Sequence, residues 1–260
     1  MLTLAIINQK GGVSKSTTAS AIGEGLRRGG ARVLFADLDA QCNLSYLMGA
    51  DMSGLVQPSA LDVLQGEASA ADAIQHTGKG DIIAASPALA QADIVLTATG
   101  KEYRLKEALE ALAGAYDYCV IDTPPALGIL TINALTACNG CIIPAQADFL
   151  SLQGIGQLHR TIATVRKYCN PGLVVYGIVL TRYSGRAVIS RDVAALMEQT
   201  AEALQTRLYN TRIRECTALK EAQANRVDIF TYSPRSHASA DYTALVNEIK
   251  EDLEGANNGK

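Results

Sequence analysis

Glycines and lysines cluster just after the first apolar segment, in the stretch NQKGGVSKSTT over residues 8–18. Gly11 and Gly12 let backbone N–H groups turn inward, and the N-terminus of a following helix carries partial positive charge. Lys15 can neutralise β- and γ-phosphates, and the Ser16 hydroxyl can ligate Mg²⁺. The stretch therefore predicts a nucleotide site. The alternative is a glycine-rich strand–helix turn with solvated lysines.

This loop departs from the standard phosphate-loop pattern G-x-x-x-x-G-K-[ST]. Gln9 and Ser14 occupy its two glycine positions, and an additional lysine, Lys10, precedes the glycine pair. If position 14 needs a positive φ, serine there costs about 1 kcal/mol. The loop is thus either a damaged nucleotide site or a different kind of site that uses two lysines.

Acidic side chains follow two further apolar runs. Asp37 and Asp39 lie in VLFADLD (33–39), and Asp122 ends YDYCVID (116–122). Carboxylates at such positions can hold Mg²⁺, directly or through water, or orient an attacking water. The alternatives are turn or N-cap roles for the first two acids and a simple strand–helix turn for the third. The Thr-Pro-Pro turn that follows the third acid is stiff and can move as a unit.

Strand-like and helix-like segments alternate along the chain. The expected strands are 2–8, 31–37, 81–86, 116–122, 139–145 and 173–181. The expected helices are 15–28, 42–48, 59–65, 87–113 with a break near Gly100, 128–138 and 149–168. This order predicts an α/β fold, a mostly parallel twisted sheet with helices on both faces. We expect one domain over 1–260, with a frayed tail over about 251–260.

The ligand of such a sheet lies beyond the carboxyl ends of its strands. The glycine-rich loop and the two acidic segments all follow predicted strands. The sequence therefore predicts that they converge on one phosphate and Mg²⁺ site.

Composition limits the cellular setting and the partners. The chain has 260 residues, 48% of them hydrophobic, and no apolar run approaches the roughly 18 residues of a membrane span. No secretory signal is evident at the N-terminus, and six scattered cysteines suit reduced thiols, so we expect a cytoplasmic protein. For the pair Cys138-x-x-Cys141, packing is favoured over a metal or redox role. The net charge of −3 excludes a global basic field, so nucleic-acid binding needs a local patch.

Four segments together resemble the ParA/Soj family of deviant Walker A ATPases, within the MinD/ParA superfamily of P-loop NTPases. They are KGGVSKST (10–17), DLDAQCN (37–43), IDTPPALGILTINALTA (121–137) and YSPRSHASADYTAL (232–245). The resemblance extends from residue 2 to about 250. It implies that Lys10 is a signature lysine that reaches the phosphates of the other subunit in an ATP-bound homodimer.

The resemblance also implies roles for individual residues. Lys10, Lys15 and Asp39 are the expected catalytic residues, and Ser16, Asp39 and Asp122 the expected Mg²⁺ residues. Thr17 is expected at the α-phosphate. The expected contacts with ATP or ADP are Lys10, Gly11, Gly12, Val13, Ser14, Lys15, Ser16 and Thr17 at the phosphates, with Thr181, Arg182, Ile213 and Arg214 at the adenine.

Residues 182–235 carry nine Lys and Arg against six Asp and Glu, a local excess of +3. Arg186 falls where the family carries a DNA-contacting arginine, whereas the second such position falls on Ala218. The expected DNA contacts are Arg186, Arg191, Arg214, Lys220 and Arg235. The alternative for each arginine is a solvated surface residue. The tail is short of basic residues, which argues against a membrane-binding helix.

The resemblance implies a Mg²⁺-dependent ATPase that partitions DNA. Its ATP-bound dimer is expected to bind DNA without sequence preference on the nucleoid, and a ParB-like partner to stimulate hydrolysis. One alternative is a MinD-like spatial regulator that acts on a membrane or protein partner. The other is a metabolic P-loop enzyme that uses ATP on a small acid.

Overall fold

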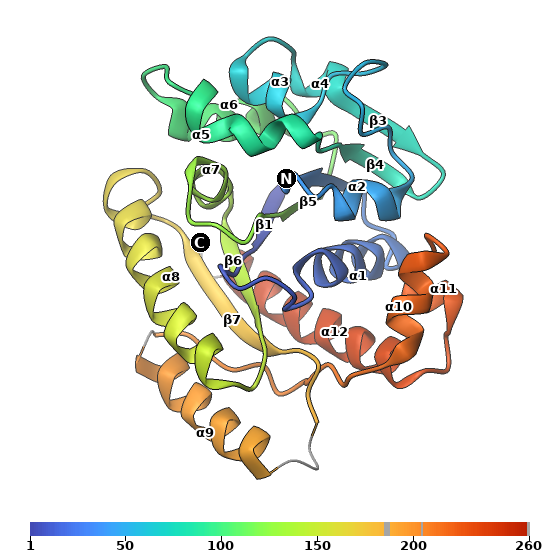
Figure 1. Cartoon of the computed structure of the whole chain (residues 1–260), viewed down its shortest axis with the longest axis vertical. Helices are drawn as coiled ribbons and strands as arrows, with labels where there is room; N and C mark the ends of the chain where they lie inside the picture. Colours follow the sequence, from blue (N-terminus) through green and yellow to red (C-terminus); the bar gives the residue numbers. More distant parts are fainter. Residues whose placement is uncertain (185–187, 204, 259–260) are drawn as a thin grey trace.

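The computed structural model describes residues 1–184, 188–203 and 205–258. These residues contain a seven-stranded sheet in the order β3-β4-β2-β5-β1-β6-β7 (Figure 1). Its strands are β1 (Leu2–Ile6), β2 (Val33–Asp37), β3 (Ile74–Thr77), β4 (Gly80–Ile83), β5 (Tyr118–Asp122), β6 (Gly140–Ala145) and β7 (Val174–Leu180). All neighbouring strands are parallel except the edge pair β3–β4. The predicted fold class is confirmed.

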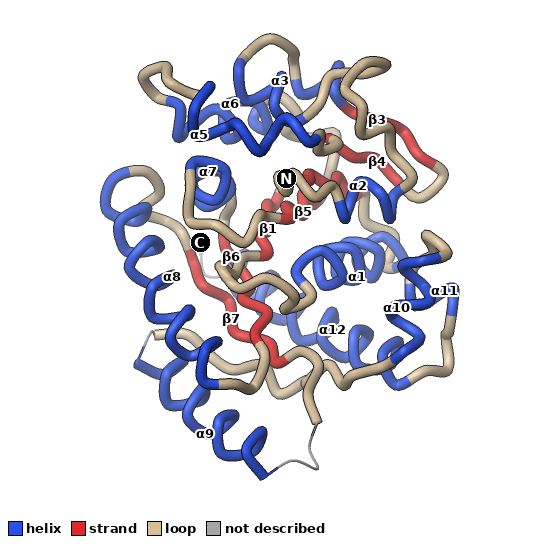
Figure 2. The backbone as a smooth tube through the Cα atoms, viewed as in Figure 1, coloured by secondary structure: helices blue, strands red, loops and turns tan. Residues whose placement is uncertain are grey.

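Helices cover both faces of the sheet (Figure 2). One face carries α1 (Lys15–Arg28), α2 (Asn43–Met48), α10 (Thr217–Ala224), α11 (Ile229–Tyr232) and α12 (His237–Asn258). The other carries α3 (Ala60–Gln65), α4 (Ala70–Ala73), η1 (Pro87–Gln91), α5 (Ala92–Val95), η2 (Lys101–Tyr103), α6 (Arg104–Glu110), α7 (Ile129–Ala137), α8 (Phe149–Tyr168) and α9 (Val188–Ala203). Each layer has its own apolar core, because strands buried on both faces project side chains into both layers.

Strand register brings the chemically active turns together. Ile6 of β1 lies opposite Asp122 of β5, and Asp37 of β2 lies opposite the same residue. Three central strands therefore end at one level. The glycine-rich loop and both acidic segments begin from that edge, as the sequence predicts.

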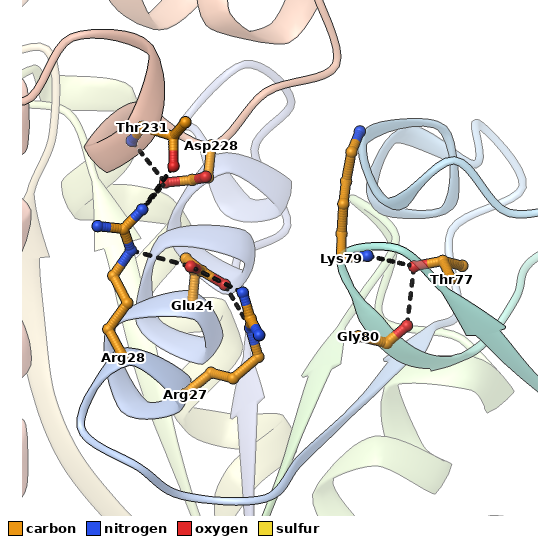
Figure 3. A network of polar contacts seen from close by, with 8 residues as sticks. All are labelled: Glu24, Arg27, Arg28, Thr77, Lys79, Gly80, Asp228 and Thr231. Carbon is orange, nitrogen blue, oxygen red and sulfur yellow. Dashed lines mark hydrogen bonds and ion pairs between the residues drawn. The ribbon is translucent and has the colours of Figure 1, made fainter.

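The edge hairpin differs from the sequence prediction. A single strand was expected over 81–86, but β4 ends at Ile83, and β3 precedes it in an antiparallel pair. The turn is local: the Thr77 hydroxyl donates to the Gly80 carbonyl at 2.8 Å, and the backbone N–H of Lys79 donates to that hydroxyl (Figure 3). Gly80 has φ +125°, a conformation that glycine readily adopts, so the chain reverses here.

Helix α12 extends into the C-terminal tail, the segment 251–260 for which fraying is expected. It is assigned up to Asn258, and the side chains after Leu253 lie outside the described residues. Leu253 is 1% exposed, and the Asp252 carboxylate accepts hydrogen bonds from Arg207 Nη2 at 2.7 Å and the Tyr209 hydroxyl at 3.0 Å. Burial of Leu253 and the contacts of Asp252 hold this part of α12 against the body of the protein.

Cys138 and Cys141 both lie in the core, at 2% and 0% exposure. Burial raises the pKa of the Cys141 thiol to about 12. Such a thiol stays neutral, which agrees with a packing role for the pair.

Candidate nucleotide-binding site

A cavity of about 580 Å³ lies beyond the carboxyl ends of β1, β2 and β5. Its walls come from the glycine-rich loop and the start of α1, from the segment after β2, from Pro125, and from residues after β7 together with α10. The cavity thus joins the three segments that sequence analysis singled out to a fourth, C-terminal wall.

The glycine-rich loop is shaped as an anion cradle. Gly12 has φ +76°, and a Cβ placed on Gly11 or Gly12 would meet no atom within 4 Å, so the backbone faces open space. Ser14 has φ +66°, the strained conformation anticipated for a serine at this position, at a cost of about 1 kcal/mol. Val13 is buried beneath the loop, and its carbonyl accepts a hydrogen bond from the Thr181 hydroxyl.

Lys15 reaches into the site from the first turn of α1. It is 7% exposed, and its Nζ donates to the Lys10 carbonyl at 3.3 Å. Burial lowers the pKa of Lys15, while Asp122 and Asp39 act in the opposite direction. A buried ammonium between two carboxylates suits the binding of a multiply charged anion with a cation beside it.

Asp37 and Asp39 have different roles although they are two residues apart. Asp37 is fully buried, and its carboxylate accepts hydrogen bonds from the Ser45 N–H, the Ser45 hydroxyl and the Asp39 N–H, at 2.8, 2.7 and 3.0 Å. Burial raises the pKa of Asp37 to about 6. Asp39 lines the cavity, and its Oδ1 accepts only from the Gln41 N–H in the described residues. Asp37 therefore holds the turn, and Asp39 presents free carboxylate capacity to the ligand.

Asp122 is the third acid and has an unsatisfied oxygen. Its Oδ1 accepts from the Thr123 N–H at 3.1 Å, whereas its buried Oδ2 has no hydrogen-bond partner within the described residues. Burial raises the pKa of Asp122 far above its ordinary value, and the nearby Ser16 hydroxyl and Lys15 act against that rise. The unpaired Asp122 oxygen, the Ser16 hydroxyl and the Asp39 carboxylate together offer hard oxygen donors. Such a set of donors fits Mg²⁺.

The far wall of the cavity contains three of the four residues expected at the adenine. Arg182, Ile213 and Arg214 line it. Thr181 does not: it is fully buried, and its hydroxyl donates to the backbone of the loop and of β6, which places it behind the phosphate cradle. Arg214 forms a bidentate ion pair with Asp241, with Nη2–Oδ1 at 2.6 Å and Nε–Oδ2 at 2.9 Å.

Sequence reasoning missed several lining residues. They are Gln41, Asn43, Tyr46, Leu47, Pro125, Leu219, Gln223 and Ala224. Those on α10 had no local signal, since they lie more than 200 positions from the loop they face. Gln223 nevertheless forms a hydrogen bond with the loop: its Nε2 donates to the Thr17 hydroxyl oxygen at 2.5 Å.

Lys10 does not line the cavity, and its side chain contacts residues of its own subunit. Its Nζ forms an ion pair with Asp148 and donates to Gln146 Oε1 at 3.3 Å and Ser151 Oγ at 3.4 Å. Asp148 is also the N-cap of α8, where its Oδ1 accepts from the Ser151 N–H at 2.9 Å. The two lysines of the loop are therefore held differently, one in the cavity and one beside it.

The sequence model of the AAA domain matches residues 1–175. The chain is 38% identical to the sporulation initiation inhibitor protein Soj of Bacillus subtilis, over 95% of this chain and 97% of Soj. The chain belongs to the ParA/Soj family of P-loop ATPases. It is also 38% identical to the chromosome partitioning protein ParA of Caulobacter vibrioides, over 95% of this chain and 92% of that protein.

A solved structure shares the fold of this chain. Cobyrinic acid a,c-diamide synthase from Mycobacterium smegmatis, solved with bound ATP analog and magnesium, superposes with a TM-score of 0.84 at 33% identity. The match covers 98% of this chain and 97% of that chain.

The expected DNA contacts of this ParA/Soj chain differ in their surroundings. Arg186 lies outside the described residues, and Arg191 lies in α9 with its side chain outside them. Arg214 is engaged by Asp241, whereas Lys220 and Arg235 are exposed. Ala218, where the resemblance places the second DNA position, is 9% exposed. Of the expected DNA contacts, Lys220 and Arg235 are thus exposed in the described part of the chain, and Lys220 also lines the nucleotide cavity.

Within the described residues, no helix has both the length and the apolar character needed to cross a bilayer.

Proposed function

We propose that this ParA/Soj family member is a Mg²⁺-dependent ATPase that partitions DNA. ATP occupies the cavity, with its phosphates at Lys15 and the loop N–H groups. Ser16, Asp39 and Asp122 would hold Mg²⁺, which would neutralise charge on the phosphates. ATP closes a homodimer through Lys10, and the dimer binds DNA without sequence preference in the cytoplasm, on the nucleoid. A ParB-like partner stimulates hydrolysis and releases the dimer.

The placement of the two loop lysines carries this proposal. Lys15 is buried in the cavity of its own subunit, whereas Lys10 lies at the rim and does not line that cavity. A cation beside the phosphate loop that does not face its own cavity is placed to serve a second one. In that position it acts as an arginine finger would, by stabilising charge on the transferring phosphoryl group.

Closure of the dimer must first break the ion pair between Lys10 and Asp148. Because their side chains are 25% and 37% exposed, each pair is worth about 0.2–1 kcal/mol, and two are broken per dimer. Asp148→Asn keeps the cap of α8 and removes the charge. We expect it to lower the dissociation constant of the ATP-bound dimer roughly 2- to 30-fold. Sedimentation equilibrium with ATP measures this constant. An unchanged value would mean that the pair does not oppose closure.

The DNA step is tested through Lys220 and Arg235. A phosphate contact contributes to affinity through counterion release, so each alanine variant is expected to reduce the slope of log affinity against log salt by about 1. Binding to duplex DNA is measured with saturating ATP at several salt concentrations. Lys167→Ala is the matched control, since it removes an exposed lysine from α8 on the other face of the sheet. If Lys220→Ala and Arg235→Ala show the same salt slope as Lys167→Ala, the DNA surface lies elsewhere.

A metabolic role is the second candidate, favoured by the likeness to the cobyrinic acid a,c-diamide synthase. That role predicts ATP hydrolysis that depends on a small acid and not on DNA. ATPase assays with duplex DNA and a ParB-like protein, or with small carboxylic acids, separate the two. A MinD-like role on membranes would instead show ATP-dependent sedimentation with liposomes.

A further inference from the structure

Helix α10 forms one wall of the nucleotide cavity, and the chain after it, which leads into α11, is anchored by polar contacts. Lys79 Nζ, from the turn of the β3–β4 hairpin, donates to the Leu47 carbonyl at 2.7 Å and to the Arg226 carbonyl. The Arg226 guanidinium stacks over Tyr46, 4.0 Å from the ring centroid. These contacts attach the end of α10 to α2 and to the sheet edge.

The start of α11 has a second anchor, at the end of α1. Arg28 Nη2 contacts Asp228 Oδ1 at 3.3 Å and Thr231 Oγ1 at 2.5 Å (Figure 3). Arg28 Nε also donates to Glu24, whose carboxylate is 9% exposed and is shared with Arg27. Figure 3 shows Arg28 between Glu24 and the α11 residues. The second anchor uses no residue that lines the nucleotide cavity, whereas Tyr46 and Leu47 of the first anchor also line it.

One polar contact joins α10 to α1 inside the cavity. Gln223 Nε2 donates to Thr17 Oγ1, and both residues line the cavity. Thr17 follows Lys15 and Ser16 in the first turn of α1, where phosphate is expected. Since these two anchors also hold α10 and α11 in place, the contact between Gln223 and Thr17 can serve the ligand rather than the fold alone.

A threonine hydroxyl has one proton and two lone pairs. When Gln223 donates to the oxygen, a lone pair is occupied, and the hydroxyl proton must point elsewhere. Thr17 lines the cavity, so the proton can point into it. We infer that Gln223 is a positioning residue that aims the Thr17 hydroxyl proton at the α-phosphate of the bound nucleotide. This inference rests on the proposed ATP site.

The direction of the hydrogen bond separates this role from a merely structural one. In Gln223→Glu the carboxylate can only accept, so the Thr17 hydroxyl donates to it and turns its proton away from the phosphate. The bridge between α10 and α1 is retained. A structural role therefore predicts normal nucleotide binding for this variant, and the positioning role predicts weaker binding.

The test measures the dissociation constant of ATP by fluorescence and kcat at saturating ATP. We expect Gln223→Glu to bind ATP roughly fivefold more weakly or worse, the factor of one hydrogen bond, with kcat changed less than about twofold. The melting temperature of the nucleotide-free variant should match that of the parent. Thr17→Val should weaken binding similarly, and Gln223→Glu should add little in that background.

Two results would overturn the inference. Normal ATP binding by Gln223→Glu would leave only a structural bridge. A full loss that persists in the Thr17→Val background would mean direct repulsion between the new carboxylate and phosphate. If the parent protein fails to bind ATP, the proposed function fails instead, before any variant is compared.

Discussion

Replacement of Lys10 with alanine is expected to abolish the ATP-dependent dimer while leaving ATP bound to the monomer. Lys15, Ser16 and the loop N–H groups lie in the cavity without Lys10, so nucleotide affinity of the monomer should stay within about threefold. Partner-stimulated hydrolysis should fall by roughly 10³-fold or more, as for loss of an arginine finger. A sizing column run with ATP, and an ATPase assay with DNA and a ParB-like protein, measure the two effects.

Asp148→Asn is the matched control for this experiment. It breaks the same ion pair from the other side but leaves the lysine in place. If the pair mattered only for stability of the fold, both variants would lose the same function. Loss of the dimer in Lys10→Ala, together with a tighter dimer in Asp148→Asn, would indicate that Lys10 acts on the nucleotide of the second subunit. A Lys10→Ala protein that still dimerises with ATP would reject the proposed switch.

Local sequence patterns predicted most of the framework of this site. Residues 15–28 carry helical periodicity and match α1, and buried runs before Asp37 and Asp122 match β2 and β5. The strand ends then follow from the geometry of a parallel sheet. Even the positive φ of Ser14 could be predicted from the sequence, because the standard loop places glycine at this position.

The remaining features depend on contacts that local patterns do not encode. Lys10 meets Asp148 across 138 positions, and Thr17 meets Gln223 across 206. The strand β3 spans only four residues at the sheet edge, with Ile74 and Gln75 buried and His76 exposed, which is too short for a clear alternation. Tertiary packing decides such features.

Replacement of Asp39 with asparagine should separate binding from hydrolysis. The Asp39 carboxylate lines the cavity and has free acceptor capacity, so it can orient an attacking water. Asparagine keeps the size and one acceptor oxygen but removes the charge. We expect the hydrolysis rate to fall roughly 10²- to 10⁴-fold while ATP still closes the dimer. The dimer should then remain on DNA, which a filter-retention time course with ATP measures against the parent.

The same substitution at Asp37 is the control, because it shows whether the loss of hydrolysis requires an acid that lines the cavity. Asp37 accepts three hydrogen bonds and does not line the cavity. An asparagine there must turn its NH₂ toward a donor, which leaves a buried group unsatisfied and costs about 1–3 kcal/mol of folding free energy. Asp37→Asn should thus lower the melting temperature, whereas Asp39→Asn should not. If both variants melt early, or if Asp39→Asn hydrolyses ATP at the parent rate, Asp39 is a turn residue, and the attacking water is oriented by another group.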